Sequence, residues 1–477
     1  MLFFGARSWY TTLNLKQNKN LFSNKNFTYN KLKTTFPLKN PKIIMKMKKN
    51  DDKKDWYQSI LSNREKTEDL TLENWKKTAM NILQNTPFPS QKDESWKLTD
   101  LSKFFKLRFT NRNSEKNNSF KTLENYLMPS VKNRIIFING EFQAELSSII
   151  NIENQASFLS LNEIDTLKKI EILESMLKGE SGMDGGFFSI LNIAFLKDVF
   201  LLNVFENMEL DEPIHIIFFG NNTKITSFFN TRLIIMGEAN SSFNIIQHHC
   251  SNSESIYFEN SSTTIRLKEK AKLEFSFVNE ISLMSTIISS IHADLEANSN
   301  INFIASSFGG FMSRISLGID LNGKEANCEI KGVSITNKSN TNDFHSRISH
   351  NYPNCRSSQF QKNLVSGKGR SIFAGKIQVQ HGSSQTEADQ LCKTLLLSSD
   401  SRIDSLPILE INNEDVKCTH GSTVSDLDQN QIFYFQSRGI SDDAAKFILT
   451  IGFIQEINCY LPIEIQKRLS GEVTKII

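Results

Sequence analysis

The sequence lacks any apolar run long enough to cross a bilayer. The longest candidates, such as Phe447 to Ile454, reach about half of the roughly 20 residues that a membrane-spanning helix needs. We therefore expect no membrane insertion. Cysteine is also sparse, because the chain has 6 among 477 residues and no Cys-x-x-Cys pair. This usage excludes a disulfide scaffold and a site built by one local cysteine motif, and it indicates free thiols in a reducing compartment.

Motifs for nucleotide and hydrolytic chemistry are missing as well. There is no Gly-x-x-x-x-Gly-Lys-Ser/Thr loop, no Gly-x-Gly-x-x-Gly fingerprint, no His-Glu-x-x-His and no Gly-x-Ser-x-Gly. We therefore expect no bound nucleotide.

Adjacent residues of a strand face opposite sides of the sheet, so His248 and His249 cannot both bind one metal ion. We predict that both are structural. His345 and His350, near Asp343, are predicted to be hydrogen-bonded scaffold residues.

The charge is divided unevenly along the chain. The first fifty residues hold ten lysines, one arginine and no acidic residue, which leaves 44 basic against 52 acidic residues in the remainder. An acidic body disfavours binding to a phosphate backbone, so nucleic acid is excluded as a partner. The basic, hydroxylated and acid-free segment 1–50 is typical of an organelle transit peptide, with a disordered basic tail as the alternative.

What the sequence does contain is a long series of short β segments between about Val199 and Gln380, with a weak internal repeat. The triplet Glu-Ala-Asn recurs, and an alternating strand pattern follows each copy; the triplets begin at Glu238, Glu296 and Glu325. A period of about 30 residues is typical of stacked repeats, which predicts a β-solenoid. A β-sandwich with regular turns is the alternative from this pattern alone.

Helical periodicity is expected on both sides of the β region. We divide the chain into a leader (1–50), an N-terminal helical domain (51–130), a β-helix core (131–400) and a C-terminal domain of a strand followed by helices (401–477). In that last domain, Asp428 to Ser437 fits one helix that ends at Gly439, and Ser441 is expected to cap the next.

One pair of residues suggests metal chemistry. Cys418 and His420 stand two apart in a predicted strand, so their side chains share a face. Thiolate sulfur and neutral imidazole are ligands of soft metals and iron–sulfur centres. On residue types alone, a purely structural role for both residues remains an alternative.

The C-terminal third resembles the SufB/SufD family of iron–sulfur cluster assembly scaffolds, and its SufD branch in particular. The matching sequence segments occur in order, from His350 to the end of the helix that begins near Asp428. They are Ile372–Val379, Gln385–Gln390, Leu395–Ser398, Leu406–Ile411, Asp415–Gly421 and Tyr434–Ile440, with weaker words at Trp96–Thr99 and Phe187–Asn192. Cys392 departs from the family pattern, which has Asn there.

The resemblance implies a mainly β protein: a right-handed parallel β-helix flanked by N- and C-terminal helical domains. It further implies a non-catalytic scaffold that pairs with a SufB-like subunit, binds a SufC-like ABC ATPase through its C-terminal helices, and could form a homodimer alone. Cys418 and His420 would then bind iron or a transient Fe–S cluster shared with the partner chain.

Two other functions remain open from the sequence. A β-helix enzyme acting on polysaccharide would need carboxylates or arginines gathered on one face, whereas the repeat strands here carry mostly Asn, Ser and scattered Lys. A purely structural partner without a metal role is the other. The family resemblance implies a plastid location, with the mitochondrion as the alternative.

Overall fold

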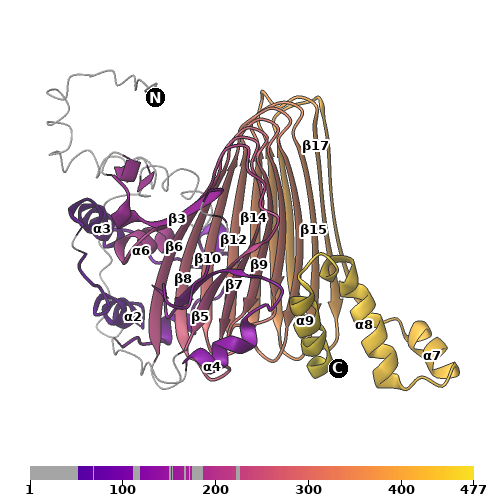
Figure 1. Cartoon of the computed structure of the whole chain (residues 1–477). Helices are drawn as coiled ribbons and strands as arrows, with labels where there is room; N and C mark the ends of the chain where they lie inside the picture. The colour runs from indigo at the N-terminus through magenta and orange to yellow at the C-terminus, as the bar shows by residue number, and fades with distance from the viewer. Residues whose placement is uncertain are drawn as a thin grey trace, which may run out of the picture.

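The computed structural model describes residues 52–477 apart from 68, 111–118, 150–151, 153, 166–167, 171, 174–185 and 222–225. The chain is mainly β and winds into a parallel β-solenoid of about 7 turns, with helices before and after it. Figure 1 shows the strands stacked side by side along one axis, and the helices at their outer faces. This confirms the predicted solenoid and excludes the sandwich. The predicted leader lies outside the described residues.

Two sheets form the walls of the solenoid, and successive strands alternate between them. Sheet A has the order β19-β17-β15-β13-β11-β9-β7-β5-β1-β2, and sheet B has the order β18-β16-β14-β12-β10-β8-β6-β4-β3. Among the described strands, β1 with β2 and β3 with β4 pair antiparallel, and the other strand pairs are parallel. Sheet A comprises β1 (Asn133–Ile138), β2 (Glu141–Phe142), β5 (Ile214–Gly220), β7 (Ser242–Ser251), β9 (Lys272–Glu280), β11 (Asn300–Ser307), β13 (Asn327–Thr336), β15 (Arg356–Val365), β17 (Thr386–Leu396) and β19 (Val416–Asp426). Sheet B comprises β3 (Ala156–Ser160), β4 (Phe200–Val204), β6 (Ser227–Gly237), β8 (Tyr257–Leu267), β10 (Thr286–Leu295), β12 (Met312–Leu321), β14 (Thr341–His350), β16 (Arg370–Val379) and β18 (Arg402–Ile411).

A column of left-handed residues forms one corner of the solenoid. Each has a φ near +60° and donates its amide N–H to a carbonyl of the next turn, as Asn240 does to Glu269 (3.0 Å) and Asn298 to Lys324 (2.9 Å). The column consists of Asn207, Asn240, Lys270, Asn298, Glu325, Asn354 and Gln385.

The Glu-Ala-Asn repeat marks this corner in two different registers. Ala239 and Ala297 precede the left-handed residue, whereas Ala271 and Ala326 follow it and are fully buried. The alanines therefore do not occupy one equivalent position, although the corner itself recurs as the repeat predicted.

Helices cover the outer faces of both sheets. The helices Asp52–Leu61, Leu70–Leu83 and Phe187–Ala194 pack against sheet B, where Trp56 contacts Phe258 with ring centroids 6.2 Å apart. The short helix Ser119–Leu123 packs against sheet A, where Leu123 joins Ile217 in one apolar cluster. The helices Asp442–Asn458 and Ile463–Ile476 also pack against sheet A, where Ile454 and Val473 join Val278 in another apolar cluster. Among the helices of the described part of the chain, none is long and apolar enough to span a membrane. The helices are α2 (Asp52–Leu61), α3 (Leu70–Leu83), α4 (Ser119–Leu123), α6 (Phe187–Ala194), α7 (Gln429–Ser437), α8 (Asp442–Asn458) and α9 (Ile463–Ile476), with short 3-10 turns at η1 (Glu94–Trp96), η2 (Phe104–Lys106), η3 (Glu124–Tyr126) and η4 (Leu161–Glu163).

The last turn of the solenoid lies beyond residue 400. Strand β18 pairs with β16, and β19 pairs with β17, both in continuous parallel register. The boundary expected at residue 400 therefore falls one turn before the solenoid ends. The predicted Ser441 cap is confirmed, because its Oγ accepts from Ala444 N–H (3.3 Å). Asp428, which we expected to be the first residue of its helix, is instead the N-cap, and its carboxylate accepts from Asn430 N–H (2.8 Å).

Candidate functional site

Cys418 and His420 lie on the last strand of sheet A, at the open end of the solenoid. Their register partners on β17 are Ala388 and Gln390, which are 5% and 2% exposed and face the interior. Cys418 and His420 therefore also face inward, and they share one face as the strand alternation predicted. Among the described strands, none pairs with the far edge of β18 or β19. The inner side chains of this turn are consequently left partly or fully open to solvent.

The turn before β19 fixes where this strand begins. The side chain of Asn413 accepts from the Asp415 amide (3.0 Å) and donates to the His381 carbonyl in the turn below (2.7 Å). The amide of the left-handed Gln385 donates to the Asp415 carbonyl (2.6 Å). These bonds tie the end turn to the corner column, so that β19 continues the parallel register. Further along, Ser422 Oγ donates to Ser405 Oγ (2.9 Å) and links β19 to β18 across the interior.

The chemistry of the two side chains differs. Cys418 is half-buried, and burial raises the pKa of its thiol above the ordinary value. A thiol with a raised pKa is protonated at neutral pH, so it would become a thiolate ligand only when a metal displaces the proton. His420 is exposed. A neutral imidazole can donate from one ring nitrogen while the other nitrogen binds a metal.

Two ligands do not complete a metal site. Across the part of the chain that the structure describes, no group of three His, Cys, Asp or Glu side chains could hold a metal ion. Tetrahedral and iron–sulfur centres ordinarily take four protein ligands. Cys418 and His420 can therefore provide at most half of such a site.

The interior beneath His420 is polar, whereas Cys418 packs against the apolar core, with Ala388 beneath it. The register column that ends at His420 runs inward through Gln390 and Gln359 before it reaches Ile330 and Phe303. Gln390 Nε2 donates to Gln359 Oε1 (2.8 Å), and both residues are buried. The buried thiol of Cys392 lies in the next column, where it accepts from Asn363 Nδ2 (3.3 Å). The end of the solenoid thus has hydrogen-bonding groups both at its surface and underneath it.

The other histidines named from the sequence belong to the scaffold, as predicted. His248 faces outward, where it meets His215 (3.1 Å) and Glu280 (2.7 Å), whereas His249 faces inward toward Glu259 (2.8 Å). Burial lowers the pKa of His248. His350 is also buried, with Nε2 2.8 Å from Ser357 Oγ.

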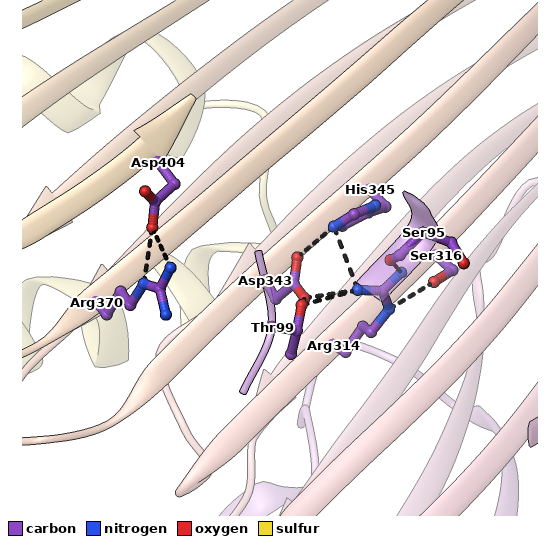
Figure 2. A network of polar contacts seen from close by, with 8 residues as sticks. All are labelled: Ser95, Thr99, Arg314, Ser316, Asp343, His345, Arg370 and Asp404. Carbon is purple, nitrogen blue, oxygen red and sulfur yellow. Dashed lines mark hydrogen bonds and ion pairs between the residues drawn. The ribbon is translucent and has the colours of Figure 1, made fainter. Parts of the chain in front are cut away.

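The sequence did not identify Arg314 as an important residue. This fully buried side chain pairs with Asp343 (Nη1 to Oδ2, 2.8 Å), and its guanidinium lies 3.9 Å from the Trp96 ring centroid. Figure 2 shows Thr99 and His345 converging on the same carboxylate; His345 Nε2 is 2.8 Å from Asp343 Oδ1. Burial opposes ionisation of Asp343, but His345 and Arg314 hold the pKa of its carboxyl below the ordinary value.

This network fastens the N-terminal segment to sheet B. Arg314 Nη2 also donates to the Ser95 carbonyl (2.7 Å). The sequence segment that could have indicated this network is Trp96–Thr99, which resembles the family, because Trp96 supplies the aromatic ring and Thr99 the hydroxyl. A separate pair, Arg370 with Asp404 (2.6 Å), joins β16 to β18 near the open end (Figure 2).

Comparisons with known proteins agree with this architecture. The SufBD protein N-terminal region matches residues 47–216, and the SufBD core domain of SUF system FeS cluster assembly matches residues 218–453. An iron–sulfur cluster assembly SufBD family protein of Synechocystis is 28% identical over 413 residues, covering 84% of this chain and 90% of the relative. Protein ABCI7, chloroplastic, of Arabidopsis thaliana is 27% identical over 395 residues, covering 81% and 82%. The iron–sulfur cluster assembly protein SufD of Escherichia coli is 26% identical over 394 residues, covering 79% and 86%.

Proposed function

Because this chain belongs to the SufBD family of iron–sulfur cluster assembly proteins, we propose that it is a SufD-type scaffold subunit that holds part of the site where a cluster forms. The observation that carries the proposal is the inward-facing pair Cys418 and His420 on the uncovered last turn. The cluster, or iron on its way to one, is the cargo. In this role His420 binds the cargo or moves a proton beside it, and Cys418 supports it as a thiolate.

The open end is the surface that we propose for a SufB-like partner. Strands β18 and β19, of 10 and 11 residues, each have an edge that pairs with no other described strand, and such edges readily pair with another chain. Two apolar side chains at this end, Ile411 (41% exposed) and Val424 (52%), would be covered by the partner. A partner seated here would lie next to Cys418 and His420, and it would supply the ligands that this chain lacks. Without that partner, the same edges could pair two copies of this chain.

The C-terminal helices are the surface that we propose for a SufC-like ATPase. The chain has no phosphate-binding loop of its own, so ATP hydrolysis is assigned to a partner. Helix α7 projects away from the sheets in Figure 1 and exposes Phe433 (71%) and Tyr434 (55%). Aromatic side chains this exposed are typical of binding surfaces. Replacing both with serine should abolish co-purification with the ATPase, and unchanged co-purification would contradict this assignment.

We place the protein in a plastid. The basic, acid-free segment 1–50 supports an organelle address, and the printed name of the Arabidopsis relative says chloroplastic. A fluorescent protein fused after residue 50 should enter plastids, whereas mitochondrial or cytosolic fluorescence would contradict the proposal.

Cluster assembly with purified partners tests the central claim. We expect His420→Ala to abolish cluster formation in an anaerobic reconstitution with SufB-like and SufC-like proteins, and Cys418→Ser to slow it. The matched control is His381→Ala, because this residue is exposed and lies outside both the inner face of the last turn and the C-terminal helices. Complexes that form normally but assemble no cluster would support the site. Normal assembly by the Cys418/His420 double variant would instead support a purely structural partner, and glycan cleavage by the purified chain would support the polysaccharide enzyme.

A further inference from the structure

We propose that Gln390 is a positioning residue that fixes the orientation of the His420 imidazole. The inference rests on the proposed role of His420 and concerns the layer immediately beneath it. Gln390 on β17 is the register partner of His420 on β19. Paired residues of neighbouring strands face the same side of the sheet, about 4.8 Å apart. The carboxamide and the imidazole therefore follow one another in the same inward column.

The amide nitrogen of Gln390 is fixed on the side away from His420. Nε2 donates to Gln359 Oε1 (2.8 Å), and the same oxygen accepts from Ser346 Oγ (2.9 Å). Gly375 on the facing strand leaves space for this arrangement, because a Cβ at that position would lie 2.1 Å from Gln390 Nε2. Nε2 is directed to the layer below, so Oε1, on the opposite side of the planar amide, is directed to the layer of His420.

The Gln390 oxygen needs a donor. The residue is 2% exposed, and Oε1 has no hydrogen-bond partner among the residues that the structure describes. Leaving a buried amide oxygen unpaired is unfavourable. In the structure no described group donates to this oxygen, His420 included, so the proposed bond forms when the exposed imidazole of His420, the next side chain in the column, turns its N–H toward Gln390.

This hydrogen bond would select one tautomer of His420. A neutral imidazole that donates from one nitrogen keeps a lone pair on the other. With the N–H bound to Gln390, the lone pair is directed away from the interior, to the open end where the cargo would bind. Outer acceptors commonly orient metal-binding histidines in this way.

Gln361 provides a matched control within the same solenoid. It is also 2% exposed, and its Oε1 likewise has no partner within the described residues. Its register partner on β17 is Cys392, however, so it belongs to the neighbouring column. Gln361→Met therefore removes a buried amide of the same kind without changing the residue beneath His420.

The tautomer can be measured directly in the full chain without metal. Long-range proton–nitrogen correlation spectra of ¹⁵N-histidine-labelled protein, at a pH where the imidazole is neutral, distinguish the two forms. The spectrum of His420→Ala assigns the His420 signal among the 8 histidines. We expect one dominant tautomer in the wild type and in Gln361→Met, and a mixture in Gln390→Met. A mixture in the wild type, an unchanged tautomer in Gln390→Met, or an equal shift in both variants would overturn the inference.

The assembly assay separates this inference from the proposed function. We expect Gln390→Met to slow cluster formation with the partners about tenfold, and Gln361→Met to leave it unchanged. A shifted tautomer with normal assembly would keep Gln390 as a positioning residue and overturn the proposed role of His420. Slow assembly with an unshifted tautomer would overturn the positioning of His420 by Gln390. Urea-unfolding curves of both variants identify any loss that comes from the fold.

Discussion

The two ends of the solenoid differ in the strands that cover them and in the polarity of the side chains in their interior. At the N-terminal end, the antiparallel pairs β1 with β2 and β3 with β4 complete the sheets. The inward column that ends at His420 starts there with the buried Asn133 and continues with Ile214, Ile245 and Phe275, all fully or almost fully buried. In the last three turns the same column contains Gln359, Gln390 and the exposed His420.

The side chains at the N-terminal end mainly stabilise the fold, whereas those at the C-terminal end are available for binding. Apolar side chains at the N-terminal end are buried without any partner, and burial is the main source of stability. Polar side chains at the C-terminal end contribute little by burial, and the free edges of β18 and β19 leave backbone groups in water. The last turn can therefore exchange water for a partner chain at a small cost in stability.

The sharpest test replaces one residue near the start and one at the end of the same inner column. Phe218, which stacks on Phe137 with ring centroids 4.8 Å apart, shares a register column with Val424 at the open end. We expect Phe218→Ala to reduce the free energy of unfolding by about 4 kcal/mol, because it leaves a cavity in a closed core. Val424→Ala should cost about 0.5 kcal/mol or less, since that side chain is already half exposed. Urea denaturation followed by circular dichroism measures both, and similar losses would mean that the two ends do not differ.

Acid should destabilise the polar half through His350. Burial lowers the pKa of His350 to about 4, whereas an unfolded histidine titrates near pH 6.5. Between these values the unfolded chain binds more protons, so stability is complete above pH 6.5 and decreases as the pH is lowered toward 4. From about pH 7.5 to about pH 5, His350 should account for a loss of about 2 kcal/mol.

The variant His350→Gln should remove this part of the acid sensitivity. Its amide can still bond to Ser357, the present partner of His350. The comparison is the difference in unfolding free energy between the two pH values, in the wild type, in His350→Gln and in the exposed control His381→Gln. An unchanged difference in His350→Gln would show that His350 is not held neutral.

Local patterns in the sequence predicted much of the fold. The corner residues with φ near +60° recur about every 30 residues, and this period is visible as the Glu-Ala-Asn repeat. The caps Asp428 and Ser441 are also local signals, because each side chain bonds to an amide two or three residues ahead. Strand alternation placed Cys418 and His420 on one face for the same reason.

Contacts between distant segments could not be predicted in this way. Arg314 is buried because Asp343, Trp96 and the Ser95 carbonyl surround it, and no local pattern connects these residues. The boundary near residue 400 was also placed too early, because β18 and β19 carry many exposed polar residues. They are exposed because no further turn of the described chain covers them. The residues of a strand do not by themselves show where the stack of turns ends.

The smallest effect on stability should come from the candidate site itself. We expect the double variant Cys418→Ser, His420→Ala to change the free energy of unfolding by no more than about 0.5 kcal/mol, because His420 is exposed and Cys418 half-buried. The same variant should fail in cluster assembly, which would show that these two residues are needed for binding and not for folding. A loss of stability near that of Phe218→Ala would instead make the pair part of the core. The last turn would then belong to the stabilising core, and the difference between the two ends would not indicate a binding site.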